Sequence, residues 1–227
     1  MAGSIAPNTV TDGLVLALDA ANPKSYPGSG TVWTDLSGNA NSGSLINGPT
    51  FDSNNLGSIV FDGVNDYVEC GNDTSLRLTT ELTLESWVKK TTTNNYHHII
   101  SKFDAGGSYS FGSVQTSGYL FFIRSTNGTN QGITDTFDIN ICDGNWKHIV
   151  CSYNSTTSTL LMAINGAIQQ STISGAIFDS TVNVNVGRRT TVGQYYTANI
   201  AYSRIYNRAL TAQEILQNYN ATKGKFI

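Results

Sequence analysis

The sequence predicts an all-β sandwich of two antiparallel sheets with one short helix near its C-terminal end. Apolar and polar residues alternate in about a dozen short segments, which is the period of strands with one buried face. Turn residues separate these segments at intervals of about 8–12 residues, as in sandwiches. Charged residues make up only 13% of the 227 residues, whereas 39% are apolar, enough for a sizeable core.

The expected strands follow one another along most of the chain. They cover residues 14–18, 57–62, 67–70, 82–88, 98–102, 109–114, 119–124, 147–153, 160–164, 182–186 and 200–206. Asn165-Gly166 stands between two apolar runs, which is typical of a two-residue hairpin turn. We expect Trp87, Val88, Ile149, Val150, Leu160 and Ile164 to lie in or near the core.

One helix is predicted over residues 211–220. Thr211 is a good N-cap, and Glu214 three residues later completes a capping box. Leu210 and Ile215 flank the cap and can form a hydrophobic staple. The helix is therefore expected to pack against the sandwich, and residues 1–12 to form an N-terminal arm before the first strand.

No linker or repeat divides the chain, so residues 1–227 are predicted to form a single domain. The first residues lack a basic region and an apolar run, which predicts no signal peptide and production in the cytoplasm. The net charge of −3 gives no attraction to nucleic acid or to an anionic membrane surface. No apolar run approaches the roughly 18 residues needed to cross a bilayer.

The three cysteines, Cys70, Cys142 and Cys151, are odd in number and widely spaced. This pattern favours free buried thiols over a disulfide framework. A bridge between Cys142 and Cys151 on two neighbouring strands is the alternative.

Five motifs occur in a fixed order along the chain: FDGVNDYV at 61–68, TLESWV at 83–88, WKHIV at 146–150, ING at 164–166 and IYNRALTAQEI at 205–215. This series resembles laminin-G-like, concanavalin A-like domains, which are relatives of the pentraxins. The resemblance covers residues 13–219 and implies a jelly roll of two antiparallel sheets. The opening, GLVLALDAANP at 13–23 followed by WTDLSGN at 33–39, is similar to openings of tailed-phage structural proteins.

Glycoside hydrolases share this fold, but their paired carboxylates are not found here. They need two carboxylates either about 5–5.5 Å or about 6.5–9.5 Å apart. The related glucanases carry them on one strand as Glu-x-Asp-x-x-Glu, a run that this sequence lacks. Glu81 and Glu85 can face the same side, but Glu85 belongs to the structural TLESWV motif, and His148 is expected to be a half-buried, hydrogen-bonded histidine. We therefore predict that the protein is not an enzyme.

The resemblance also suggests calcium, because laminin-G-like domains often bind it. Asp19, Asp35 and Asn39 are the candidate ligands of a structural ion, although local hydrogen bonding in turns explains such residues equally well. The pentraxin calcium site is expected to be lost. Its ligands follow the strand matching 182–187, where this chain has Arg188-Arg189, and guanidinium groups repel Ca²⁺. No cofactor is predicted to be required.

A recognition surface is predicted where loops carry arginine and tyrosine. Its candidate residues are Tyr96, Arg188, Arg189, Tyr195 and Tyr196. Guanidinium groups suit carboxylates, phosphates and sugar hydroxyls, and aromatic rings suit sugars and protein partners. Sugar binding, protein contact and simple packing on the rim of the sandwich all remain open at this point.

The resemblances favour a non-enzymatic structural protein of a tailed phage, a capsid decoration or a tail or fibre component located in the virion. Its expected partners are other virion proteins. The alternative is a carbohydrate-binding, lectin-like module or an adhesin that recognises a host glycan. Formation of a homo-oligomer stays open.

Overall fold

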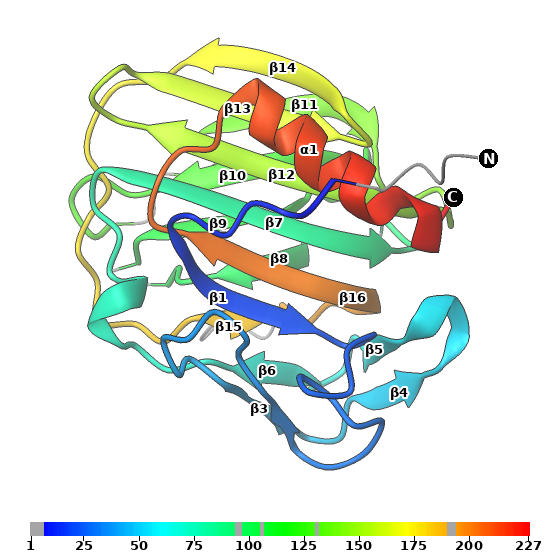
Figure 1. Cartoon of the computed structure of the whole chain (residues 1–227). Coiled ribbons are helices and arrows are strands. Elements are labelled where there is room, and N and C mark those ends of the chain that lie inside the picture. The colour runs from blue at the N-terminus through cyan, green and yellow to red at the C-terminus, as the bar shows by residue number, and fades with distance from the viewer. Residues whose placement is uncertain (1–6, 94–96, 105–106, 130–131, 190–193) are drawn as a thin grey trace.

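The computed structural model describes residues 7–93, 97–104, 107–129, 132–189 and 194–227. Its strands form two sheets of eight strands each, packed face to face (Figure 1). Every pairing between the described strands is antiparallel. The predicted two-sheet, all-β sandwich with one short C-terminal helix is therefore confirmed.

The first sheet, sheet A, contains the longest strands. Its order is β14 (Ala167–Thr172), β13 (Thr159–Ile164), β12 (Trp146–Asn154), β7 (Glu81–Lys89), β16 (Thr197–Tyr206), β5 (Ser58–Asp62) and β4 (Thr50–Asp52), and β1 (Leu14–Asp19) also pairs with β16. β16 pairs with β5 through its first residues and with β1 through its last, so these two strands share one side of β16.

The second sheet, sheet B, faces sheet A across the core. Its order is β11 (Asp135–Asn140), β10 (Tyr119–Arg124), β9 (Tyr109–Ser113), β8 (His97–Ser101), β15 (Asn185–Val186), β6 (Tyr67–Glu69), β3 (Gly43–Ile46) and β2 (Val32–Trp33). The described residues also contain three short 3₁₀ turns: η1 (Asn54–Leu56), η2 (Thr74–Leu76) and η3 (Lys223–Lys225). Each of the eleven strands expected from the sequence overlaps an observed strand, whereas β2, β3, β4, β11 and β14 are additional.

All six residues predicted for the core are buried. Val88, Ile149, Leu160 and Ile164 belong to the main core between the sheets. Trp87 and Val150 point to the outer face of sheet A, where side chains of the C-terminal helix cover them. Sheet A is therefore buried on both faces over part of its area, which its continuous apolar and small residues permit.

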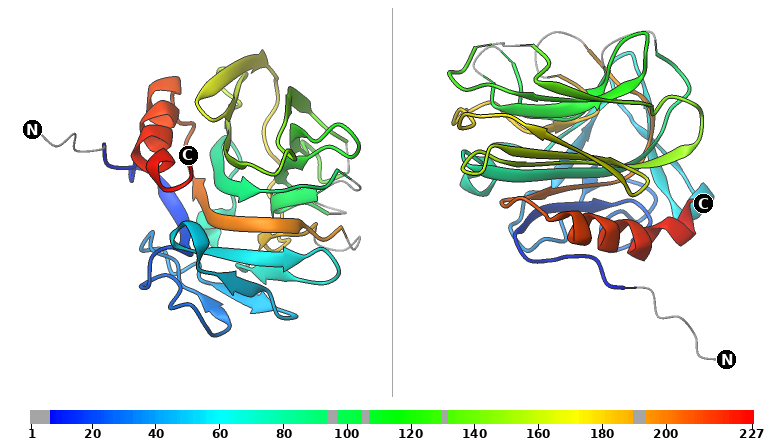
Figure 2. Two further views of the ribbon diagram at one scale, coloured as in Figure 1. Left: turned by 90° about the vertical axis from the view of Figure 1, so that its right-hand side faces the viewer. Right: turned by 90° about the horizontal axis from the view of Figure 1, so that it is seen from above.

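The helix α1 (Ala212–Thr222) lies along the outer face of sheet A (Figures 1 and 2). The predicted capping box is present: the Thr211 hydroxyl accepts from the Glu214 amide, and the Glu214 carboxylate accepts from the Thr211 amide. The described part of the N-terminal arm packs onto this helix, since the Val10 amide donates to Asn218 Oδ1 at 2.8 Å.

The turn between β13 and β14 also follows the prediction. Asn165 and Gly166 have φ angles of +50° and +82°, as a type I′ hairpin turn requires. All three cysteines are buried and free, so the predicted free thiols are confirmed and a Cys142–Cys151 bridge is not formed. No helix in the described part of the chain is long and apolar enough to cross a membrane.

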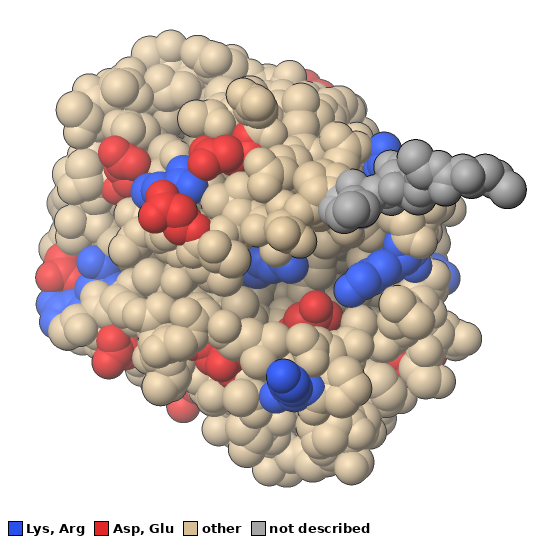
Figure 3. Space-filling model, viewed as in Figure 1, with Lys and Arg blue, Asp and Glu red and all other residues tan. Residues whose placement is uncertain are grey.

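Charge is sparse on the face that carries α1. Most of this face shows neither acidic nor basic side chains, and the charged residues lie in small groups (Figure 3). Arg208 and Glu214 form one such pair beside the start of the helix, at 2.7 Å. This face therefore has no broad positive patch that would attract nucleic acid.

Candidate functional site

A hairpin between β15 and β16 carries four of the predicted recognition residues. A single antiparallel bridge between Arg188 and Tyr195 closes it, and residues 190–193 lie outside the described part of the chain. Gly187 at its base has a φ of +86°, and a Cβ there would lie 2.7 Å from the Phe61 ring. Glycine is therefore needed where the chain turns out of sheet B.

Arg188 lies over the ring of Tyr67. The centre of its guanidinium group is 3.5 Å from the ring centroid, within the range of a cation–π contact. Its Nε donates to Asn185 Oδ1 at 3.4 Å, and its Nη2 lies 4.0 Å from Glu69 Oε2. The Arg188 side chain is 14% exposed and that of Glu69 is 38% exposed, so both reach solvent.

Strand alternation explains why these residues meet. Val68 and Val186 point into the core, so Tyr67, Glu69 and Asn185 beside them point to the outer face of sheet B. β6 and β15 are hydrogen-bonded neighbours, with Asn185 opposite Glu69.

Tyr195 extends this surface. Its ring centroid lies 6.4 Å from that of Tyr67, and its side chain is partly exposed. The carbonyl oxygen of Tyr195 accepts a hydrogen bond from His97 Nδ1 at 3.1 Å, which ties the hairpin to β8. Burial, with the nearby charge of Lys90, lowers the pKa of His97 to about 4, so the ring is neutral near pH 7. We call Tyr67, Glu69, Asn185, Arg188 and Tyr195 the Arg188 patch.

The other predicted recognition residues do not join the Arg188 patch. Arg189 contacts a different ring, with its guanidinium 5.1 Å from the centroid of Phe103. Tyr196 is completely buried beneath Lys90, so its prediction as a surface residue is wrong. Adjacent residues of an extended segment point in opposite directions, so Tyr195 and Tyr196 cannot share one surface. Tyr96 lies outside the described residues.

The candidate calcium ligands are engaged by the chain itself. Asp35 accepts four hydrogen bonds: Oδ1 accepts from the amides of Ala17 and Ser37, and Oδ2 from the Ser37 hydroxyl and the Asn41 amide. The Asn39 side-chain amide donates to the Leu14 carbonyl. These bonds occupy the lone pairs that a calcium ion would need, so Asp35 as arranged does not fit an ion.

Asp19 accepts a hydrogen bond from the Ala21 amide at 3.0 Å. The described residues contain no group of three or more His, Cys, Asp or Glu side chains able to hold a metal. Asp35 as arranged thus does not serve an ion, and calcium binding by Asp19 and Asn39 stays a prediction from the resemblance.

Glu81 and Glu85 do not form an open carboxylate pair. Glu85 is completely buried and accepts a hydrogen bond from His148 Nε2 at 2.8 Å. Glu81 accepts from the Asn154 side chain and the Ala209 amide. His148, expected to be half-buried, has no exposed surface because α1 covers it. Both carboxylates thus hold the fold together.

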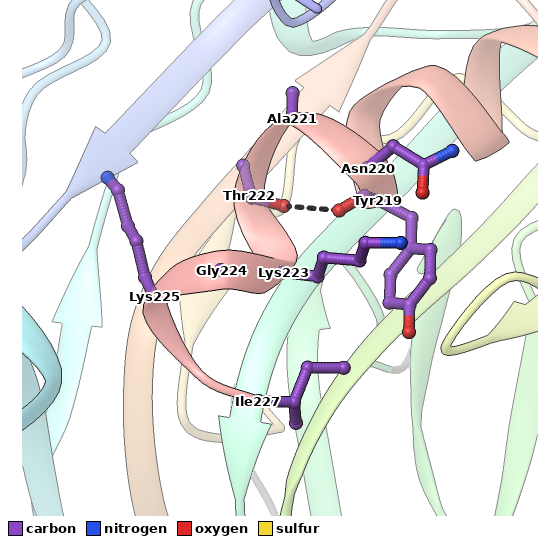
Figure 4. Close-up of a pocket in the computed structure, with 8 residues that line it drawn as sticks. All are labelled: Tyr219, Asn220, Ala221, Thr222, Lys223, Gly224, Lys225 and Ile227. Atoms are coloured by element: carbon purple, nitrogen blue, oxygen red, sulfur yellow. Dashed lines mark hydrogen bonds between the residues drawn. The ribbon is translucent and has the colours of Figure 1, made fainter. Parts of the chain in front are cut away.

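A hollow of about 520 Å³ lies at the C-terminal end of α1. Figure 4 shows the Lys223 side chain running along the ring of Tyr219, and Lys225 pointing away from it. The Lys223 ammonium is 5.3 Å from that ring centroid. The four predicted recognition residues that the structure describes do not line this hollow.

Residues 62–216, which include the whole Arg188 patch, match the family model of the concanavalin A-like lectin/glucanases superfamily. The chain belongs to this superfamily. No curated protein matches the chain. The superfamily's name covers both lectins and glucanases, so membership by itself does not separate binding from hydrolysis.

Solved structures with the same sandwich include three toxin structures. The binding domain of Paraclostridial Mosquitocidal Protein 1 is 18% identical with a TM-score of 0.69 over 93% of this chain. The binding domain of Botulinum neurotoxin DC in complex with rat synaptotagmin II is 14% identical with a TM-score of 0.74 over 94% of this chain. A structure of botulinum neurotoxin type C, whose cell entry depends on interaction with two ganglioside molecules, is 14% identical with a TM-score of 0.70 over 94% of this chain.

This superfamily member spans 52% of the length of each of these three structures. At such identities the likeness shows a shared fold.

Three residues of the Arg188 patch, Tyr67, Glu69 and Asn185, are not predicted from the sequence. Their alternation with buried residues is visible, but their meeting with Arg188 depends on the register of β6 against β15.

Proposed function

We propose that this chain is a non-enzymatic recognition module that binds a glycan through the Arg188 patch. The main support for this proposal is the position of the Arg188 guanidinium, which lies over Tyr67 and 4.0 Å from the partly exposed carboxylate of Glu69. Guanidinium groups, carboxylates and tyrosine rings are the groups with which proteins bind sugar hydroxyls and the apolar faces of sugar rings. The toxin structures with the same fold, described as binding domains, support this reading.

A glycan array with the purified chain tests the proposal. Tyr195→Ala and Arg188→Ala should abolish binding to the glycans that the wild type retains. Tyr119→Ala is the matched control, because this partly exposed tyrosine lies on β10, several strands from the patch. Wild-type binding to no glycan, or equal loss in all three variants, would contradict the proposal.

The absence of turnover is part of the proposal. Glu85, the carboxylate in the structural TLESWV motif, is completely buried and hydrogen-bonded, which leaves it unable to reach a glycosidic bond. A recognition role needs only the partly exposed patch.

The opening of the chain supports a second candidate, a tailed-phage structural protein acting through contacts with other virion proteins. The segment similar to phage proteins forms β1 and the loop closed by Asp35 onto Ala17. Co-purification of the protein with intact particles at a fixed copy number would support this role. A virion protein that binds a host glycan through the Arg188 patch would combine the two roles.

A further inference from the structure

Resting on the proposed glycan-binding role, we infer that the Arg188 patch takes a neutral sugar with adjacent hydroxyl groups, and not an acidic sugar. The inference depends on what Glu69 does beside Arg188. A lone arginine on an aromatic ring favours a carboxylate ligand, whereas an arginine paired with a carboxylate does not.

The charge of the patch is balanced. Glu69 Oε2 lies 4.0 Å from Arg188 Nη2, and both side chains reach solvent. A carboxylate ligand that approached Arg188 would therefore meet the negative charge of Glu69 at a similar distance. Attraction and repulsion of similar size cancel, so the patch offers a sugar acid little net electrostatic gain.

The spacing suits a hydroxyl group. At 4.0 Å the Arg188 and Glu69 atoms are too far apart for a direct hydrogen bond. An oxygen placed about 2.8 Å from each would see the two atoms at an angle of about 90°. A sugar hydroxyl there can accept from the guanidinium and donate to the carboxylate, and a ligand carboxylate can do only the first.

Both partners have hydrogen-bonding capacity to spare. Arg188 uses its Nε on Asn185, which leaves its terminal nitrogens for a ligand. Glu69 accepts no hydrogen bond from the described residues, so its exposed oxygens are open to a second hydroxyl. A pair of adjacent hydroxyls can therefore bridge the two side chains.

The aromatic side of the patch agrees with a sugar ring. One face of Tyr67 is covered by Arg188, and the ring of Tyr195 lies beside it, partly exposed. The apolar face of a neutral hexose can pack on Tyr195 while its hydroxyls reach Arg188 and Glu69.

The test compares neutral oligosaccharides with their sialylated, uronic and sulfated counterparts, using the wild type and Glu69→Gln. We expect binding to neutral glycans that changes little between about 0.05 and 0.5 M salt. Glu69→Gln should weaken this binding about tenfold or more, because a charge-assisted hydrogen bond is lost. Asp138→Asn removes an exposed carboxylate on β11 and should leave binding unchanged.

Each other outcome overturns the inference in a distinguishable way. Preference for acidic glycans, strengthened by Glu69→Gln and weakened by salt, overturns the ligand class but keeps the glycan-binding role. Neutral-glycan binding that Glu69→Gln does not change places the sugar elsewhere. Binding to no glycan by a folded wild-type protein overturns the proposed function itself.

Discussion

The Nε2 atom of His148 lies 2.8 Å from the Oε1 atom of Glu85, and both side chains are completely buried between sheet A and α1. The same carboxylate accepts hydrogen bonds from the Tyr202 hydroxyl at 2.8 Å and the Asn218 amide at 2.9 Å. Burial by itself raises the pKa of Glu85. The charge of Arg204 and the hydrogen bond from His148 outweigh this effect and lower the pKa to about 2. One carboxylate of β7 thus ties the C-terminal helix to the sheet.

Glu85→Ala should destabilise the protein by about 3–5 kcal/mol, because it leaves buried donors and the Arg204 charge without their acceptor. Denaturant unfolding at pH 7 measures this loss. Glu69→Ala is the control, since Glu69 is 38% exposed and its ion pair with Arg188 is long, and it should cost less than about 1 kcal/mol. Equal losses of unfolding free energy in the two variants would show that the buried carboxylate of Glu85 stabilises the fold no more than the exposed carboxylate of Glu69.

Stability should decrease as the pH falls below about 6.5. Burial, with the charge of Arg189, lowers the pKa of His98 to about 3, whereas an unfolded histidine titrates near 6.5. Between these values the unfolded chain binds a proton that the folded chain does not. The free energy of unfolding therefore decreases as the pH is lowered from about 6.5, until the folded ring also protonates near pH 3.

Unfolding measured at pH 7, 6, 5 and 4 tests this dependence. His98→Gln removes the titrating ring and keeps a polar group near the Ser110 hydroxyl, which lies 2.7 Å from His98 Nδ1. The variant should show a flatter dependence of stability on pH than the wild type. An unchanged slope would show that His98 takes up its proton equally in both states.

Local signals in the sequence predict local structure well here. The Thr211–Glu214 capping box and the Asn165-Gly166 turn form as expected, because neighbouring residues determine both. The short strands β2 and β4 are not predicted, since they hold two and three residues among Gly-, Asn- and Ser-rich loops. Each becomes a strand only by pairing at a sheet edge with the next strand along the chain, β2 with β3 and β4 with β5.

The candidate site is predicted in part. Arg188 and Tyr195 stand out by residue type, and the structure places both on one surface with Tyr67. Which of two neighbouring residues faces solvent depends on the side of the strand that packs inward. This is why Tyr196 is buried although the sequence favours it equally with Tyr195.

Leu160→Ala and Ile164→Ala should each destabilise the protein by about 2–5 kcal/mol, because both side chains fill the core between the sheets. Ile139→Ala on the edge strand β11 is the matched control at 37% exposure, and should change stability by less than about 0.5 kcal/mol. Thermal and denaturant unfolding give the comparison. Losses below about 0.5 kcal/mol at both core sites would show that neither side chain packs in the core.

Thr211→Ala should cost about 1 kcal/mol, because the hydroxyl accepts the Glu214 amide at the start of α1. Thr181→Ala, at an exposed position between strands, should be close to neutral. If both variants unfold at the same denaturant concentration as the wild type, the cap contributes no stability, and the packing of Ile215 and the Glu85–Asn218 hydrogen bond hold the helix without it.

The purified chain should release no reducing sugar from laminarin, agarose or similar polysaccharides. Hydrolysis requires two carboxylates that flank the glycosidic bond, one to donate a proton and one to attack or to activate water. Glu85 has no exposed surface, and its low pKa of about 2 leaves it without the proton that a general acid must supply. Glu81 accepts a hydrogen bond from the Ala209 amide at 2.9 Å, which fixes it to the loop before α1.

Hydrolysis by the wild type that Glu81→Gln abolishes, with the variant still folded by circular dichroism, would show that a catalytic pair exists after all. Hydrolysis that survives in both Glu81→Gln and Glu85→Gln would place catalysis on other residues and would equally contradict the non-enzymatic role.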